Sequence, residues 1–268
     1  MRTVKLFLTI AILALLSPLS ALAQTESGLL MELEAQKKIN KNLSVSLEGD
    51  FRTRNDFQTI DRWKIGLGAS YKINSWLKAD AGYSMIYDNN REKVEYYSTY
   101  EDDGVTVKHN KVKWRPSYWS IKHRVTASLT GSYKFDNGIR ISLRERWQYT
   151  YRPEKATTRW KWRVDGSDDI DMTLDDDYVR SGSGKSQLRS RFQIEYDRKH
   201  VKWNPYASIE LFNSWGIEKI RYTAGTDYKI NKQHTVGAFY RFQQLEDKEE
   251  GIYDPNMHYL GVSYKFKF

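Results

Sequence analysis

Met257-His258-Tyr259-Leu260-Gly261-Val262-Ser263-Tyr264-Lys265-Phe266-Lys267-Phe268 is the last stretch of the chain, and its alternation decides the fold. Apolar side chains occupy every second position from Leu260 to Phe268, and the positions between them are polar or small. A period of two indicates a β-strand with one apolar and one polar face. The stretch ends on an aromatic residue, which fits a membrane barrel strand whose outer face meets lipid.

The same alternation recurs through most of the chain after residue 28. Ten earlier segments repeat it, at 29–39, 43–52, 62–73, 77–87, 119–135, 139–151, 188–196, 204–213, 220–230 and 236–242. Turn residues stand where the alternation pauses, and Asp136-Asn137-Gly138 is the clearest tight-turn signal. The sequence therefore predicts an all-β fold, a transmembrane antiparallel β-barrel of about 10–12 strands.

Two short repeats orient the predicted strands. Lys-Ile-Asn occurs at 38–40, 72–74 and 229–231, each time before a short turn, and Tyr-Lys-Phe occurs at 133–135 and 264–266. Strands ending on these signatures run toward the same side, which we predict to be periplasmic because outer-membrane barrels have short periplasmic turns. Long polar connections near 89–117, 153–186 and 244–256 are then extracellular loops.

The strand count raises a question about how the barrel closes. Eleven segments is an odd number, whereas bacterial single-chain barrels usually have an even one. The first segment ends on Lys38-Ile39-Asn40, so it runs in the same direction as the last. Either a strand is missed or counted in excess, or the closing pair is parallel.

Aromatic residues gather at both ends of the predicted strands. Those near the short turns include Tyr71, Trp76, Tyr133, Phe135, Tyr196, Tyr228, Tyr264, Phe266 and Phe268; those near the long loops include Tyr87, Trp119, Tyr149, Tyr151, Tyr240 and Phe242. Small and aliphatic residues occupy much of the space between. Two aromatic girdles around an aliphatic band match a bilayer with two interfaces.

The start of the chain has the pattern of a secretory signal. A basic head, Met1 to Lys5, precedes an apolar run from Leu6 to Leu16, and Ala21-Leu22-Ala23 follows. This predicts a signal peptide over 1–23 with cleavage near Ala23-Gln24, and a barrel over 24–268. The predicted location is the outer membrane of a Gram-negative bacterium. The chain has no Cys, which excludes disulfides and thiolate metal sites.

The polar faces of the strands carry many charges, and on the inward parity cations outnumber anions. The basic residues of the predicted lumen are Arg52, Arg62, Lys64, Lys122, Arg124, Arg140, Arg144, Arg146, Arg189, Arg191, Arg221 and Arg241. The acidic ones are Glu32, Glu34, Glu48, Asp50, Asp80, Glu195, Glu210 and Asp227. One interpretation is an anion-preferring pore, since charged rings set selectivity. The alternative, which we favour at this strand number, is a narrow lumen nearly filled by paired side chains.

A net charge of +9 would also suit a nucleic-acid-binding protein, but the export signal and strand pattern argue against one. The expected partners are lipid and lipopolysaccharide of the outer membrane. We expect no cofactor and no metal. Although 165–177 is rich in Asp, its spacing does not match an EF-hand loop, so a solvated acidic loop is the better interpretation. The connection 89–117 mixes aromatic and charged residues and could extend the barrel as a hairpin.

A lipid-modifying enzyme is the alternative from another functional class. His123, Glu145 and Ser190 have outward parity on three successive strands, so a lipid-facing Ser-His-Glu set is conceivable. The turn at Asp136-Asn137-Gly138 pairs His123 with about Tyr151, well away from Glu145. We therefore predict no catalytic residues, and a transport or surface-interaction barrel is the preferred function.

Three segments resemble a known family: Leu-Ser-Val-Ser-Leu-Glu at 43–48, Gly-Ala-Ser-Tyr-Lys-Ile-Asn at 68–74 and Asn-Pro-Tyr-Ala-Ser-Ile-Glu-Leu-Phe at 204–212. Together with the terminal Tyr264-Lys265-Phe266-Lys267-Phe268, they are similar to the Gram-negative outer-membrane barrels of domain of unknown function 2490. The resemblance implies a barrel without assigned catalytic residues. The terminal aromatic residues Tyr264, Phe266 and Phe268 resemble the signal that the barrel-assembly machinery recognises, which implies that machinery and periplasmic chaperones as partners.

Overall fold

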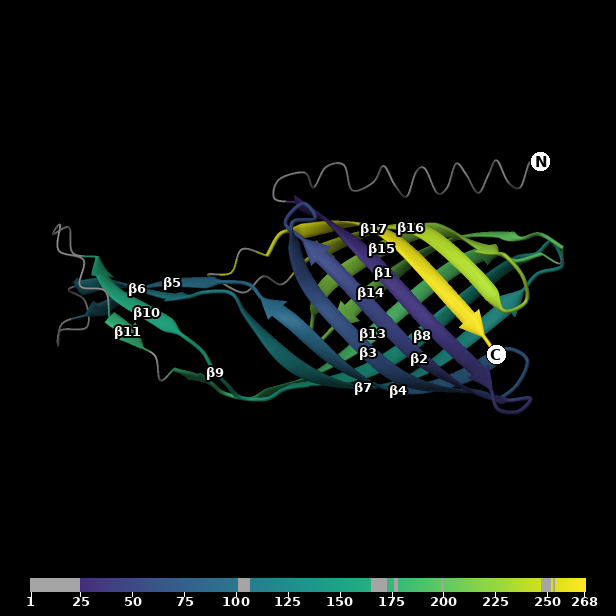
Figure 1. Ribbon diagram of the computed structural model, residues 1–268, viewed down its shortest axis with the longest axis horizontal. Coiled ribbons are helices and arrows are strands. Elements are labelled where there is room, and N and C mark those ends of the chain that lie inside the picture. The colour runs from purple at the N-terminus through teal and green to yellow at the C-terminus, as the bar shows by residue number, and fades with distance from the viewer. Residues whose placement is uncertain are drawn as a thin grey trace.

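The computed structural model describes residues 25–100, 107–164, 173–175, 178–198, 200–246, 252 and 254–268; the predicted signal peptide lies outside them. In this part of the chain, eleven strands form a closed barrel (Figure 1). The barrel strands are β1 (Thr25–Lys38), β2 (Leu43–Arg54), β3 (Thr59–Lys72), β4 (Leu77–Asn90), β7 (Tyr118–Lys134), β8 (Ile139–Arg152), β13 (Ser183–Tyr196), β14 (Trp203–Asn213), β15 (Ile217–Lys229), β16 (His234–Leu245) and β17 (Asn256–Lys267). All eleven predicted segments are strands, so the predicted fold class is confirmed.

The barrel closes through a parallel pair. β1 pairs with β17 in parallel from Thr25 opposite Asn256 to Gln36 opposite Lys267, and every other neighbouring pair in the barrel is antiparallel. The Phe268 N–H donates to the Gln36 carbonyl at 2.9 Å, so the pairing continues to the last residue. The odd strand count and the shared direction of the first and last segments are therefore both explained.

The Lys-Ile-Asn repeat has a local structural cause. In each copy the asparagine side chain accepts hydrogen bonds from the backbone N–H groups two and three residues later, at 2.8–2.9 Å. The acceptors are Asn40, Asn74 and Asn231. Asparagine favours such turns because its short side chain can replace a backbone acceptor. The repeat therefore encodes three copies of one tight turn at the same end of the barrel.

The predicted turn at Asp136-Asn137-Gly138 joins β7 to β8. Gly138 has a φ of 91°, a left-handed conformation that glycine adopts without a Cβ clash. Its N–H donates to the Phe135 carbonyl at 3.0 Å. The turn sets the register that pairs His123 with Tyr151 further along the two strands.

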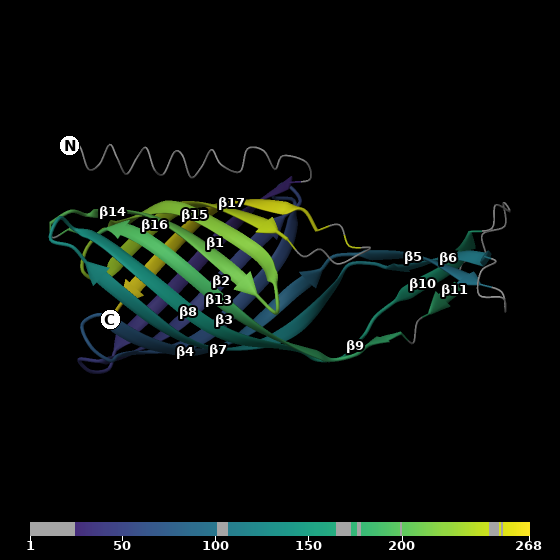
Figure 2. The same cartoon turned by 180° about the vertical axis from the view of Figure 1, so that it is seen from behind.

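A smaller sheet projects beyond the opposite end of the barrel (Figures 1 and 2). It contains β5 (Lys93–Tyr100), β6 (Val107–Arg115), β10 (Arg159–Val164) and β11 (Thr173–Asp175), in the order β11-β10-β6-β5. The short strands β9 (Lys155–Ala156) and β12 (Val179–Arg180) pair with each other, and β9 lies between this sheet and the barrel (Figure 1). The connection 89–117 forms the predicted hairpin, and the connection 153–186 supplies the strand beside it.

The outer face of the barrel is apolar around its circumference. Exposed hydrophobic side chains on the wall include Leu33, Leu67, Leu129, Leu143, Leu188, Phe192, Leu260 and Val262. Exposed aromatic residues lie toward the strand ends, as in Tyr71 and Tyr133 at the short turns and Tyr87 and Tyr151 at the other end. No helix among the described residues is long and apolar enough to cross a membrane.

The buried apolar core lies inside the barrel, beside the parallel pair. It consists of Leu30, Phe239, Met257 and Tyr259, with Tyr206 packed against them. Gly261 lies opposite both Leu30 and Phe239 in the sheet, and a Cβ there would come within 2.1 Å of the Phe239 ring. The large Phe239 side chain therefore lies over the small Gly261 of the neighbouring strand, in space that a larger residue at 261 would fill.

Candidate functional site

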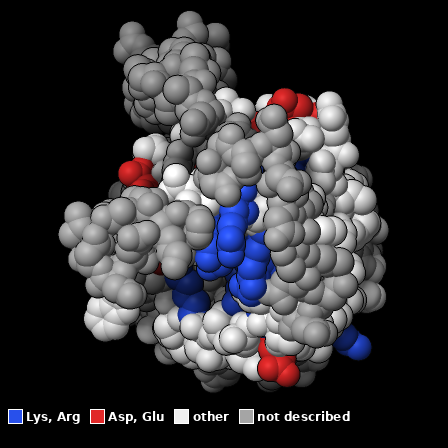
Figure 3. Space-filling view, turned by 90° about the vertical axis from the view of Figure 1, so that its left-hand side faces the viewer, with Lys and Arg blue, Asp and Glu red and all other residues white. Residues whose placement is uncertain are grey.

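The barrel encloses a charged cavity of about 920 Å³. Eleven of the twelve basic residues that strand parity assigned to the lumen line it, and Arg140 does not: Arg52, Arg62, Lys64, Lys122, Arg124, Arg144, Arg146, Arg189, Arg191, Arg221 and Arg241. Viewed from the end that carries the projecting sheet, lysine and arginine side chains gather in the hollow (Figure 3). The interior is thus filled only in part, and more open than the packed lumen that we favoured from the sequence.

Glu210 is the main counter-charge on one side of the cavity. Its carboxylate accepts from Arg144 at 2.5 Å, Arg189 at 2.8 Å and Arg221 at 3.2 Å. The Glu210 side chain is only 4% exposed. A buried carboxylate of this kind is stable only because its hydrogen-bonding capacity is filled by charged donors.

Asp88 has the same role on the other side. It accepts from Arg62 Nε at 2.6 Å and also pairs with Lys122. Arg241 pairs with Glu32 at 3.0 Å and Lys64 pairs with Glu48 at 3.5 Å. Ion pairs therefore line much of the cavity wall, although cations remain in excess among its lining residues.

Aromatic rings contact several of the cations that line the cavity. Arg189, Lys219 and Arg221 lie over the Phe212 ring, with 4.3–4.7 Å between each charged group and the ring centroid. Arg241 lies 4.7 Å from the centroid of Phe239. Cation–π contacts orient these side chains without neutralising them, so the positive potential of the cavity is kept.

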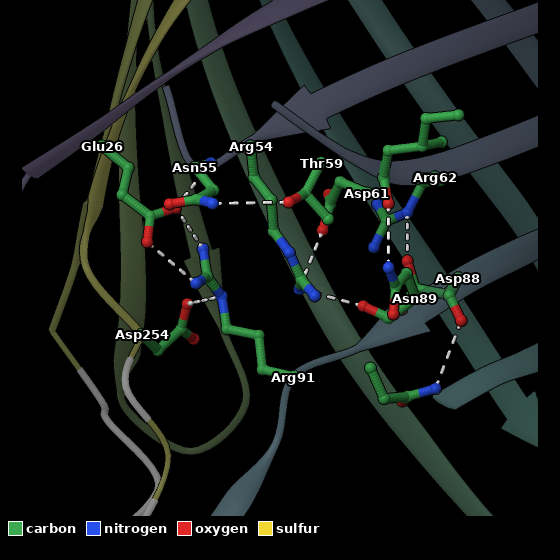
Figure 4. A network of polar contacts seen from close by, with 12 residues as sticks. Glu26, Arg54, Asn55, Thr59, Asp61, Arg62, Asp88, Asn89, Arg91 and Asp254 are labelled. Carbon is green, nitrogen blue, oxygen red and sulfur yellow. Dashed lines mark hydrogen bonds and ion pairs between the residues drawn. The ribbon is translucent and has the colours of Figure 1, made fainter. Parts of the chain in front are cut away.

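At the mouth, Arg91 joins three parts of the chain (Figure 4). It donates to both oxygens of Glu26, at 3.0 and 2.8 Å, and its Nε lies 3.8 Å from Asp254. Glu26 also accepts from the backbone N–H of Asn55 at 3.0 Å. This network connects the start of β1, the turn after β2, the segment after β4 and the connection before β17.

Replacing Arg91 should destabilise the barrel at this end. We expect Arg91→Met to lower the free energy of unfolding by about 1.5–3 kcal/mol, because Glu26 loses two charge-assisted hydrogen bonds in a largely buried pair. Urea unfolding of the refolded barrel measures the loss. Lys78→Met is the matched control, since Lys78 is 48% exposed in its pair with Asp80 and should change stability by less than about 1 kcal/mol. A full, additive effect of Arg91→Met in a Glu26→Gln background would contradict this assignment.

Two acidic groups outside the strands have shifted pKa values. Burial raises the pKa of Asp254, and Arg91 opposes the shift. Burial would also raise the pKa of Asp197, but hydrogen bonds from Lys229 at 2.8 Å and Lys134 at 3.0 Å hold it well below its ordinary value. Asp197 therefore stays ionised, and its ion pairs link the short-turn ends of β7, β13 and β15.

Parity reasoning missed several lining residues: Arg54, Arg91, Arg115, Arg152, Arg180, Lys219 and Lys265. Arg54, Arg152 and Lys219 continue the alternation of Arg52, Thr150 and Arg221, so extending each segment by two residues would have found them. Arg91 lies between strands, where no period applies. Arg140, which parity also placed in the lumen, pairs with Glu195 and Asp197 near the short turns.

The three residues of the hypothetical catalytic set do not meet. Ser190 donates to Glu145 at 2.6 Å, but His123 bonds the Tyr83 hydroxyl at 2.7 Å. In the β7–β8 register Glu145 lies opposite Leu129, whereas His123 lies opposite Tyr151. The histidine is thus about 20 Å along the strand from the Ser–Glu pair. Within the described residues no group of His, Asp or Glu could hold a metal ion, and most of the Asp-rich stretch 165–177 lies outside them.

Comparison with known proteins shows a family and several similar solved structures, two of which are described below. A model described as protein of unknown function (DUF2490) matches residues 27–254. No curated protein matches the sequence. The β domain of the Bordetella autotransporter Brka is 11% identical, with a TM-score of 0.46 and 86% of each chain covered. The CymD monoaromatic hydrocarbon channel is 9% identical, with a TM-score of 0.35 over 86% of this chain and 87% of that chain.

Proposed function

The chain belongs to the DUF2490 family of proteins of unknown function, and from this premise we propose that it is an outer-membrane barrel that admits small anions into its lumen. The excess of buried arginine around a cavity of about 920 Å³ carries the proposal. A lumen that only needed filling would balance its charges, because an unpaired buried cation is costly. Charge excess inside a membrane barrel is instead a property of pores that select by charge.

The outer face supports placement in a membrane. Large hydrophobic side chains such as Leu67 and Leu143 are more than half exposed, at 64% and 53%, and others surround the barrel. A continuous apolar surface of this kind is stable against lipid and unfavourable against water. With the short turns in the periplasm, the projecting sheet and the mouth at Arg91 face the cell exterior. Anions would then enter from outside.

The proposal predicts anion selectivity in planar bilayers. Refolded protein should conduct, and in a KCl gradient the reversal potential should have the sign of chloride permeation. Arg124→Gln should reduce this selectivity, because Arg124 lines the cavity and its hydrogen bond in the described chain goes to neutral Thr150 at 3.0 Å. Arg140→Gln, at the short-turn end and 39% exposed, is the control. Absence of conductance at every voltage, or cation selectivity, would end the pore proposal.

Biogenesis follows the same proposal. Export would use the signal peptide over 1–23, and the aromatic residues Tyr264, Phe266 and Phe268 would present the assembly signal to the barrel-assembly machinery and periplasmic chaperones. Tyr264 and Phe266 alternate along β17 with Lys265 and Lys267, and Phe268 directly follows the strand. A surface-interaction role, which the projecting sheet would serve, and a lipid-modifying activity remain the alternative hypotheses. The separation of His123 from the Ser190–Glu145 pair argues against the latter.

A further inference from the structure

Four arginines face one another inside the cavity on two neighbouring strands. In the β8–β13 register, Arg146 lies directly opposite Arg189 and Arg144 lies directly opposite Arg191. All four line the cavity, and we call them the arginine quartet. Cross-strand neighbours have Cα atoms about 4.5–5.5 Å apart, and like charges at that position destabilise a sheet. Two consecutive like-charge pairs therefore need compensation from another group.

The protein supplies only part of that compensation. Glu210, on β14, contacts Arg144 and Arg189 of the quartet, and it shares its carboxylate with Arg221. Within the described residues Arg146 and Arg191 make no ion pair. The Nε atoms of all four quartet members are buried without a hydrogen-bond partner. The repulsion between the cross-strand guanidinium groups costs free energy, and an anion in the adjacent cavity would reduce that cost.

Resting on the proposed function, we propose that the arginine quartet is a binding site for a small phosphate-bearing solute. Guanidinium groups recognise phosphate oxygens in bidentate fashion, and several of them match a multivalent anion better than chloride. The single carboxylate of Glu210 offsets one of the five positive charges of the quartet and Arg221, and a dianion would offset two of the four that remain. The cavity volume of about 920 Å³ leaves room for an organic group beyond the phosphate.

The four arginines of the quartet fall into two pairs with different contacts. Arg144 and Arg189 are held by Glu210 at 2.5 and 2.8 Å, so their orientation is fixed before a ligand arrives. Arg146 and Arg191 form no ion pair within the described residues, so their positive charges are available to a ligand. Preorganised donors reduce the cost of ordering on binding. Neutralising Arg146 and Arg191 should therefore weaken phosphate binding while removing a like-charge repulsion from the folded barrel.

The test compares ligand binding with stability in refolded barrel. Inorganic phosphate and glucose 1-phosphate are titrated at constant ionic strength against chloride, with calorimetry and the melting temperature as readouts. Both phosphates should bind wild type and raise its melting temperature above the chloride value. Arg146→Gln/Arg191→Gln should bind them about ten- to a hundredfold more weakly, as expected for lost charge-assisted hydrogen bonds. Its melting temperature without ligand should equal or exceed that of wild type. Arg140→Gln should bind like wild type.

Equal stabilisation by chloride and phosphate would contradict the proposed phosphate site. Unchanged phosphate binding in the double variant would also contradict it. A double variant that melts well below wild type without ligand would overturn the assignment of Arg146 and Arg191 as ligand-binding rather than structural. Bilayer conductance in KCl distinguishes this failure from failure of the pore. Phosphate binding without conductance would retain the site and remove the pore, whereas selective conductance without phosphate binding would do the reverse.

Discussion

Glu210→Gln is expected to lower the free energy of unfolding of the barrel by about 3–5 kcal/mol, the cost of removing one partner from a buried ion pair. The substitution preserves shape but leaves Arg144, Arg189 and Arg221 without their shared carboxylate, which lay 2.5–3.2 Å from them. Urea unfolding of the refolded protein, followed by tryptophan fluorescence, measures the change. The loss should be the largest among single charge-neutralising variants of the lumen.

Two further variants separate charge from packing at this site. Glu34→Gln is the matched control, because Glu34 and its partner Lys265 are both 32% exposed and an exposed pair contributes less than about 1 kcal/mol. Arg189→Gln should restore part of the stability lost in Glu210→Gln, since it removes surplus positive charge. Similar losses in the Glu210 and Glu34 variants, or a further loss on adding Arg189→Gln, would show that Glu210 is not the centre of the charge network.

Phe239→Ala should cost about 3–5 kcal/mol, as expected for removal of a buried aromatic side chain. Phe239 is 6% exposed and belongs to the apolar core beside the parallel closing pair. Removal of the ring should leave a void beside Leu30 and Gly261. It should also weaken the apolar packing against the inner faces of β1 and β17. Phe192→Ala is the control, because Phe192 faces outward and is 46% exposed. Urea unfolding compares the two variants.

The glycine next to Phe239 provides an internal check. In wild type, Gly261→Leu should destabilise the barrel, since a Cβ at that position would lie 2.1 Å from the Phe239 ring. In the Phe239→Ala background the same change should be tolerated or stabilising, because the side chain enters the space that the ring has left. The change in unfolding free energy of the double variant should therefore differ from the sum of the two single changes by more than is seen for distant residues. Additive effects would contradict the packing described for the closing pair.

The inward or outward facing of the side chains and a strand number of about 10–12 were predictable from the sequence because both depend on a period of two. The repeated Lys-Ile-Asn turns indicated strand direction and made a parallel closing pair one of two alternatives, and the structure shows that β1 and β17 are parallel. Parity could not predict which charged side chains form ion pairs with one another. Glu210 shared an inward parity with many other charges, and its three arginine partners depend on the shear of the closed barrel and on side-chain length.

The inner apolar core was missed for a related reason. Leu30, Phe239 and Tyr259 have the same parity as the lumen charges, so they looked like exceptions to a polar face. Their contacts depend on which strands become neighbours at closure. In the same way, β10 pairs with β6 although the two belong to different connections. No alternation within one segment encodes such a pairing.

The parallel closing pair gives the molecule a sidedness that even-numbered barrels lack. Thr25 lies opposite Asn256 at the end that carries the projecting sheet, whereas Phe268 lies beside Gln36 at the short-turn end. A chain that crosses the bilayer an odd number of times finishes on the side opposite to its start. In the proposed orientation the start of β1 would lie at the cell surface and the end of β17 would lie on the periplasmic side.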